Sequence, residues 1–216
     1  DGVLTIAIDG VEHAVLSSDV LQICGAHNVL NAFYIGAVLQ TEKIAEILGI
    51  ERQKQGQALT DAFHRAFYNE KTGLFTDCEE SEHSSLHANA IPAFYGINRP
   101  ENDRAIRDLM MEKGLSCGVY MSYFVLKALC RMGYLEDAYR LIVNTTEHSW
   151  YNMVREGATP CFEAWGKDQK WNTSLCHPWA SAPVSVLAED ILPALPQYGR
   201  IVYKDRSFFE NRKSIK

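Results

Sequence analysis

Residues 28–49 read NVLNAFYIGAVLQTEKIAEILG, and this stretch decides the fold class. Its apolar side chains, beginning with Leu30 and ending with Leu48, recur every three or four residues, which is the spacing of one helix face. Gly49 stands where a helix would end. The stretch therefore predicts a long amphipathic helix.

The same period returns along the chain after short turn-rich connections, which is typical of antiparallel helix hairpins. Further helices are expected over residues 59–67, 84–95, from about 101 to 111, 119–132, 135–143 and about 179–189. About seven helices in hairpins predict an all-α fold, either an open bundle, a helical solenoid or an α/α toroid. No strict sequence repeat is present, which disfavours a recognition solenoid.

The two ends of the chain differ from this helical middle. Residues 4–8 and 14–16 alternate around a turn, and residues 201–203 also suggest a strand. We therefore expect three parts: a strand and loop lead-in over 1–27, cut from a preceding half domain, a helical catalytic half domain over 28–192, and a tail with a strand over 193–216.

Composition excludes several classes of protein. The 216 residues carry a net charge of −6 without a basic stripe, so nucleic acid is not an expected partner. No apolar stretch reaches the roughly 20 residues that span a membrane, and no secretory signal is visible. The compartment is left open between bacterial cytoplasm and periplasm. The six cysteines form no CxxC pair, so buried free thiols are expected rather than disulfides.

The segment that carries chemistry is the long connection 156–183, which is dense in Trp, Glu and His. Long loops without secondary structure in compact domains are usually functional. Glu163 lies between Phe162 and Trp165. Aromatic faces and a carboxylate are what a sugar site needs, although a capping or surface role for Glu163 fits the pattern too.

Two motifs in this connection are Gly157-Ala158-Thr159-x-x-Phe162-Glu163-x-Trp165 and Ser174-Leu175-x-His177-x-Trp179-Ala180-Ser181-Ala182. Together they resemble a segment of the bacterial α-L-rhamnosidases, glycoside hydrolase family 78, and the similarity extends over about residues 28–192. The resemblance implies an (α/α)6 six-hairpin toroid, of which this chain would be a part, and hydrolysis with inversion. It also implies that Glu163 is the general base and that His177 lies beside it and the sugar hydroxyls. The sequence departs from the family at Pro160, Cys161 and Phe162.

The resemblance also suggests substrate contacts. Trp165 and Trp179 would shape the sugar pocket, and Trp150, Tyr151 and Trp171 either frame the site or bury the loop. His87 is either a substrate hydrogen-bond partner or a histidine satisfied at the start of its helix. Tyr120 either faces the cavity or belongs to the core.

An inverting glycosidase needs a second carboxyl as general acid. The resemblance places that acid in the first half of the toroid, and we find no counterpart here. The only acidic cluster, Asp77 with residues 79–82, suggests a solvated run of charge. Asp77, His83 and His87 lack diagnostic metal-ligand spacing, so a metal is not expected. No other cofactor is expected, because glycosidic hydrolysis by two carboxylates requires none.

The expected function is hydrolysis of terminal α-L-rhamnosyl linkages, with this chain a piece that lacks the acid. One alternative is a non-catalytic half toroid with weak carbohydrate binding, which would dimerise through helix faces that the missing N-terminal half normally covers. Another is a six-hairpin hydrolase of a different sugar, such as an unsaturated uronide.

Overall fold

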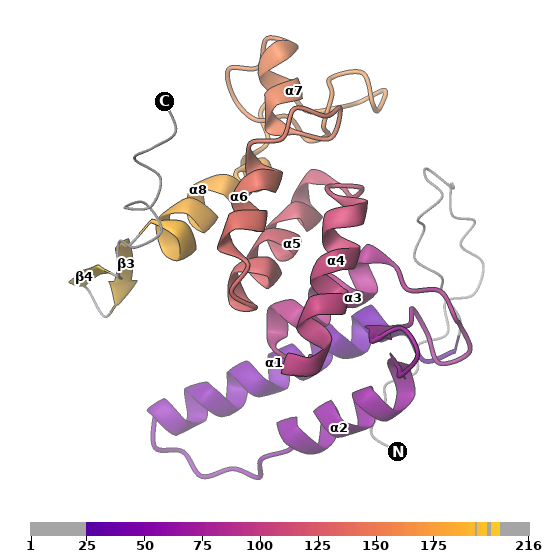
Figure 1. Ribbon diagram of the computed structural model, residues 1–216. Coiled ribbons are helices and arrows are strands. Elements are labelled where there is room, and N and C mark those ends of the chain that lie inside the picture. The colour runs from indigo at the N-terminus through magenta and orange to yellow at the C-terminus, as the bar shows by residue number, and fades with distance from the viewer. Residues whose placement is uncertain (1–24, 193, 198–199, 204–216) are drawn as a thin grey trace. The chain divides into compact units, whose positions relative to one another are not determined.

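The computed structural model describes residues 25–192, 194–197 and 200–203 and confirms an all-helical class (Figure 1). The chain forms two compact units, Asp1–Lys113 and Gly114–Lys216. The first unit contains α1 (Asn28–Ile47), α2 (Gly56–Phe67), β1 (Tyr68–Asn69), β2 (Leu74–Phe75), α3 (Leu86–Tyr95), η1 (Pro100–Asn102) and α4 (Asp103–Lys113). The second contains α5 (Val119–Arg131), α6 (Leu135–Ile142), α7 (Trp150–Arg155), η2 (Pro178–Ala180), α8 (Ala182–Val186), η3 (Leu187–Ile191), β3 (Ala194–Gln197) and β4 (Arg200–Tyr203).

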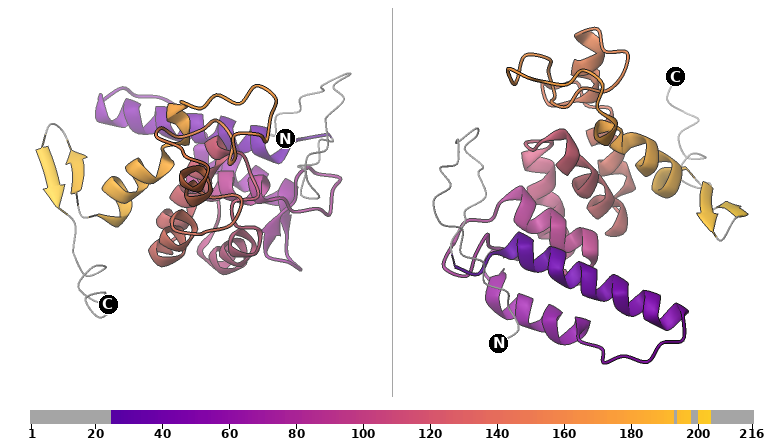
Figure 2. Two further views of the ribbon diagram at one scale, coloured as in Figure 1. Left: turned by 90° about the horizontal axis from the view of Figure 1, so that it is seen from above. Right: turned by 180° about the vertical axis from the view of Figure 1, so that it is seen from behind.

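In the first unit, α1 packs on both α2 and α3, and Figure 2 shows α1 and α2 running side by side. Helix α1 buries Ala32 and Ile35 and ends as predicted before Gly49, whose φ of 67° lies in the left-handed region that favours glycine. Because Gly36 has no side chain, α1 approaches α3 closely enough for the Tyr95 ring to lie against its backbone.

An aromatic cluster forms the core under α2. The Phe63 and Phe67 ring centroids are 4.8 Å apart, and the Phe75 ring lies 5.2 Å from Phe63. Phe75 belongs to β2, which pairs antiparallel with β1. The hairpin therefore closes the end of α2 with an aromatic side chain.

In the second unit, α5 is the central helix and packs on α6, α8 and η2. Leu126 and Leu129 on α5 are completely buried. Lys127 on the same helix bonds Glu189 at 3.0 Å and Asp190 at 2.6 Å, which fastens η3 to α5.

Most of the expected helices are present in the structure. The helices over 28–48 and 59–67, those near 84–95 and 101–111, and those over 119–132 and 135–143 are confirmed to within a few residues. The strand over 201–203 is β4, which pairs with β3. The expected single helix over 179–189 is instead divided among η2, α8 and η3. Helix α7 was not predicted, and the expected strands over 4–8 and 14–16 lie outside the described residues.

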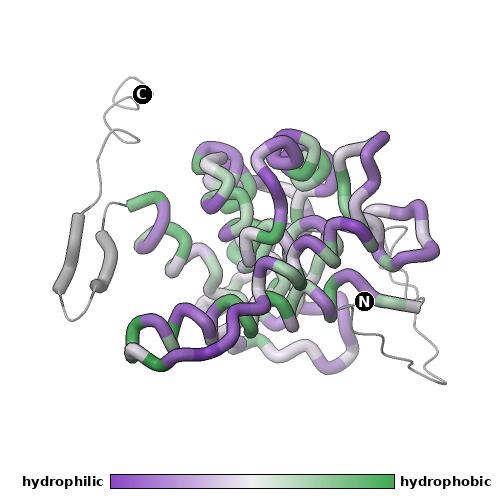
Figure 3. The backbone as a smooth tube through the Cα atoms, turned by 90° about the horizontal axis from the view of Figure 1, so that it is seen from below, coloured by the Kyte–Doolittle hydropathy of each residue, from purple (hydrophilic) through white to green (hydrophobic). Residues whose placement is uncertain are grey.

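Apolar and polar residues are interleaved along the helices (Figure 3). Among the described residues, no helix is long and apolar enough to cross a membrane.

The cysteines only partly follow the expectation of buried free thiols. Cys117 is buried and free, and burial raises its pKa to about 12. The Cys130 and Cys161 thiols are half-buried, the Cys176 thiol is exposed, and none of the three is disulfide-bonded. Cys78 is disulfide-bonded, so the expectation was wrong at that position.

The close approach at Gly36 gives a first prediction. A Cβ there would lie 2.3 Å from the Tyr95 ring, which is itself packed against Phe33 and Phe94. Gly→Ala inside a helix normally stabilises by about 1 kcal/mol. Here overpacking should outweigh that gain, and Gly36→Ala should lower the free energy of unfolding by about 1 kcal/mol in urea titrations. Gly118→Ala, which meets open space, should change it by less than about 0.5 kcal/mol. A more stable Gly36→Ala protein would contradict this packing.

Two buried histidines give a second prediction. Burial lowers the pKa of His27 and of His64 below the ordinary 6.5, and His64 Nε2 donates to the Ile97 carbonyl at 2.7 Å. Below pH 6.5 the unfolded chain therefore binds protons that the folded chain does not, so stability should fall as pH drops from 7 toward 5. Each extra proton contributes at most about 1.4 kcal/mol per pH unit.

His64→Gln should flatten this pH dependence in urea titrations while leaving a constant difference from the wild type between pH 7 and 8. An unchanged slope below pH 6.5 would show that His64 does not titrate in this way.

Candidate active site

The loop between α7 and η2 is anchored by Trp165, whose side chain is only 2% exposed. Its indole N–H donates to the Cys117 carbonyl at 2.5 Å, and its ring packs edge-on against Trp150 and stacks on His148. The Trp165 carbonyl accepts a bond from the Asn152 side chain of α7. Trp165 thus fixes the loop to its own unit, and its predicted contact with sugar remains a prediction.

Helix α7 has only six residues and is stabilised by a side-chain cap at its start. The Ser149 hydroxyl accepts from the Asn152 amide at 3.0 Å, which satisfies a free N–H of the first turn. The indole N–H of Trp150 donates to the Ala180 carbonyl at 2.7 Å. Helix α7, which precedes the loop, is therefore bonded to η2, which follows it. Trp150 helps to bury the loop and does not frame the candidate site.

Two backbone hydrogen bonds bring the predicted catalytic residues together. The Glu163 amide donates to the Ser174 carbonyl, and the His177 amide donates to the Cys161 carbonyl, both at 2.8 Å. Residues 161–163 therefore lie alongside residues 174–177. The two motifs, which an insert separates in sequence, therefore lie side by side in the loop.

The Glu163 carboxylate is held at both oxygens. The Lys170 ammonium donates to Oε1 at 2.6 Å, and the Ser174 amide donates to Oε2 at 3.0 Å. These two bonds, with the positive charge of Lys170 and of His177, lower the pKa of Glu163 below its ordinary 4.5, against the opposing effect of desolvation. The side chain retains 19% exposure. An ionised, accessible carboxylate is suited to accept a proton and not to donate one at neutral pH.

Beside it lies an exposed aromatic surface formed by Trp179 and Tyr120. The ring centroids of His177 and Trp179 are 4.2 Å apart, and those of Trp179 and Tyr120 are 5.4 Å apart. Trp179 is 48% exposed and Tyr120 is 54% exposed, so neither is a core residue in this unit. Such aromatic faces can stack on the apolar face of a pyranose ring. Their predicted role in binding substrate remains a prediction.

His87 lies in the other unit, in the first turn of α3, and is half-buried. The start of this helix is capped by Ser85, whose hydroxyl accepts from the Ala88 amide at 3.1 Å. His87 is therefore placed at the helix start as predicted. Its contact with substrate remains a prediction.

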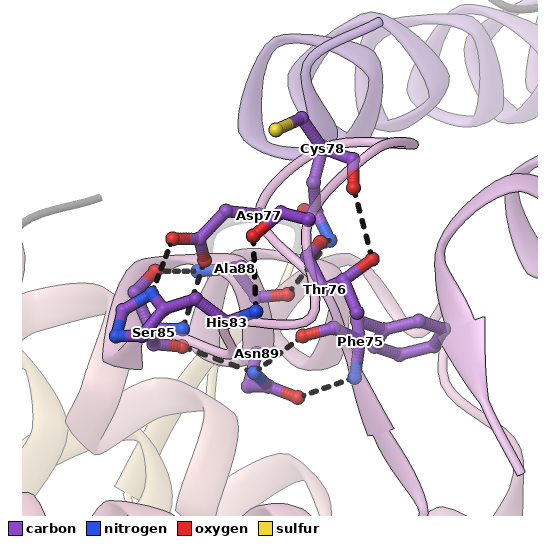
Figure 4. Close-up of polar contacts among 10 residues, drawn as sticks. Phe75, Thr76, Asp77, Cys78, His83, Ser85, Ala88 and Asn89 are labelled. Carbon is purple, nitrogen blue, oxygen red and sulfur yellow. Dashed lines mark hydrogen bonds and ion pairs between the residues drawn. The ribbon is translucent and has the colours of Figure 1, made fainter. Parts of the chain in front are cut away.

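The acidic cluster near α3 divides into a buried and an exposed part. Figure 4 shows the polar contacts of the buried residue, Asp77. Asp77 is completely buried, and its carboxylate accepts bonds from His83 Nδ1 at 2.7 Å and from the Ser85 amide at 2.8 Å. Glu79, Glu80 and Glu82 are exposed. The expectation of a solvated run of charge holds for these glutamates and was wrong for Asp77, which fastens the loop to the start of α3.

Neighbouring Asn89 reinforces this attachment by bonding both the amide and the carbonyl of Phe75 (Figure 4). Within the described part of the chain, no three His, Cys, Asp or Glu side chains are grouped so that they could hold a metal ion.

Lys170 is the site residue that sequence reasoning missed. It lies seven residues after Glu163, inside the insert between the two motifs, and no local pattern marks it. Only the folding of the insert brings its ammonium to the carboxylate. Trp171, which follows it, is 96% exposed and therefore does not bury the loop.

Comparisons with known proteins agree with the fold and the family. A family model described as the bacterial α-L-rhamnosidase 6 hairpin glycosidase domain matches residues 17–191. An α-L-rhamnosidase of Formosa agariphila is 28% identical over 155 residues, which are 67% of this chain and 16% of that protein. The crystal structure of Streptomyces avermitilis α-L-rhamnosidase complexed with L-rhamnose is similar with a TM-score of 0.63 and 19% identity, covering 79% of this chain and 17% of that one. The chain thus spans about one sixth of the length of either relative.

The anchoring role of Trp165 predicts a contrast between two tryptophans of the same loop. Trp165→Leu removes a buried ring and leaves the Cys117 carbonyl unsatisfied, so the free energy of unfolding should fall by about 3 kcal/mol. Limited proteolysis should then cut faster within residues 158–178. Trp171→Leu should alter neither quantity, since that ring is exposed. Equal behaviour of the two variants would contradict the anchor.

Proposed function

We propose that this chain, which belongs to the bacterial α-L-rhamnosidase six-hairpin glycosidase domain family, supplies the general base of an enzyme that hydrolyses terminal α-L-rhamnosyl linkages. The single observation that carries the proposal is the state of Glu163. Two hydrogen bonds favour the ionised form of its carboxylate, on a loop whose motifs resemble those of the family. In this proposal Glu163 removes a proton from the water that attacks the anomeric carbon.

The neighbouring groups fit the remaining needs of a sugar site. Trp179 and Tyr120 offer apolar faces next to His177, and the imidazole of His177 would orient the base, the water or a sugar hydroxyl. Rhamnose carries a methyl group in place of a hydroxymethyl group, which adds apolar surface for such contacts. Both relatives are described as α-L-rhamnosidases, and the solved one contains L-rhamnose.

Inversion requires a second carboxyl, protonated and about 6.5–9.5 Å from the base, to protonate the leaving oxygen. A carboxyl held ionised like Glu163 cannot serve as that acid. We infer that the acid comes from the part of the six-hairpin domain that this chain does not include, and that hydrolysis needs both parts.

Glu163→Gln, in the protein that carries the complete catalytic domain, should lower kcat on an aryl α-L-rhamnoside by about 100- to 10,000-fold. Rhamnose binding, measured by calorimetry, should change little because the amide has the same shape. Glu147→Gln, a change at an exposed residue of the same unit, should leave both quantities unaltered. Near-normal hydrolysis by Glu163→Gln would exclude Glu163 as the base. A wild type that cleaves unsaturated uronides and no rhamnoside would exclude the proposed substrate.

A further inference from the structure

We propose that Lys170 is a positioning residue for Glu163, holding one carboxylate oxygen through its ammonium while the Ser174 amide holds the other. This inference rests on the proposed function, in which Glu163 is the base. It adds a residue from the insert between the two motifs. The insert would then be part of the catalytic machinery rather than a passive connection.

The two donors bond different oxygens of the Glu163 carboxylate and together fix its orientation. A single hydrogen bond would leave the Glu163 side chain free to turn about its last torsion. Bonds at 2.6 Å to Oε1 and 3.0 Å to Oε2 fix the plane of the carboxylate. A carboxylate has about four acceptor positions, so two remain for a water molecule and a second donor. Lys170 therefore orients the Glu163 carboxylate and leaves acceptor positions open for the attacking water.

Lys170 is itself held in place by a tight turn. The Thr173 amide donates to the Lys170 carbonyl at 3.3 Å, and the Thr173 hydroxyl donates to the same carbonyl at 2.9 Å. The Lys170 amide in turn lies 3.3 Å from the Thr173 hydroxyl oxygen. This turn fixes the backbone from which the ammonium reaches Glu163.

The turn is tied to the Trp165 anchor. The Gln169 side chain accepts from the Trp165 amide at 3.0 Å, and the Lys167 amide donates to Glu156 at 2.8 Å. Exposed ion pairs usually contribute little because two long side chains must be ordered. Here the backbone on both sides of the pair is already ordered, so the pair can set a geometry even though Lys170 is 41% exposed.

The positive charge has a chemical consequence for the base. An ammonium in contact with a carboxylate favours the ionised form and lowers the pKa of Glu163. The base thus stays available at mildly acidic pH, at the expense of some basicity. Lys170→Met would keep an unbranched side chain of similar length and lose the charge, whereas Lys170→Arg would keep the charge and the donors.

The pairing can be tested without catalysis by carbon-13 NMR titration of the Glu163 carboxyl in the 216-residue chain, with Glu163→Gln to assign the signal. Lys170→Met should raise the pKa of Glu163 toward or above 4.5, and Lys170→Arg should keep it low. Lys167→Met is the matched control, because the Lys167 side chain does not contact Glu163, and it should leave that pKa unchanged. An unchanged pKa in Lys170→Met would overturn the proposal, whatever the protein hydrolyses.

The positioning role is tested by the pH dependence of kcat/KM on an aryl rhamnoside in the protein that carries the complete domain. Lys170→Met should move the acidic limb to higher pH and lower the plateau kcat about tenfold, with KM within about twofold. Lys170→Arg should restore both. An unmoved acidic limb, or a rise in kcat that would mark the ammonium as a block on the base, would overturn the proposal. A wild type without rhamnosidase activity would remove the proposed function and this role together, while the NMR titration would still report on the pairing.

Discussion

The burial of Trp165 is the constraint on which the candidate site depends. A loop without helices or strands can present a catalytic group in one geometry only if fixed points hold it. The indole supplies such a point through its N–H bond to Cys117 and its packing against Trp150 and His148. Glu163 lies two residues before this anchor in the sequence. The insert that carries Lys170 follows directly after it.

The electrostatic character of Glu163 separates the two roles that a carboxyl can have in glycoside hydrolysis. A general acid needs a raised pKa, which burial or a neighbouring negative charge can give. Glu163 has two donors and partial exposure, which give the opposite shift. The environment of this residue therefore fits a base, and a complete reaction requires an acid held in a different environment.

Much of the fold was predictable because helix periodicity is a local property. The stretch over 28–49 gave α1 and its end at Gly49, and the helices over 119–131 and 135–142 followed from the same pattern. Helix α7 could not be predicted in this way, since six residues are too few to show a period and the Ser149 cap gives it order. The helical run near the C-terminal end was expected as one helix and is divided by changes in its hydrogen bonding.

At the candidate site, residue type revealed Glu163 and its aromatic neighbours, but not which of them are buried. Trp165 and Trp179 look alike in sequence, yet one is 2% exposed and the other 48%. The burial of Asp77 depends on the His83 and Ser85 contacts, and the pairing of Lys170 with Glu163 depends on how the insert folds. Both depend on how an irregular loop folds back on residues six to eight positions away, which no periodic sequence pattern predicts.

The most direct test of the central claim is a crystal structure of the complete catalytic domain with Glu163→Gln and an intact α-L-rhamnoside. If residue 163 is the base, an ordered water will lie within about 3 Å of its side chain and face the anomeric carbon opposite the leaving oxygen. A residue 163 that contacts the glycosidic oxygen, or that lies away from the anomeric carbon, would contradict the assignment.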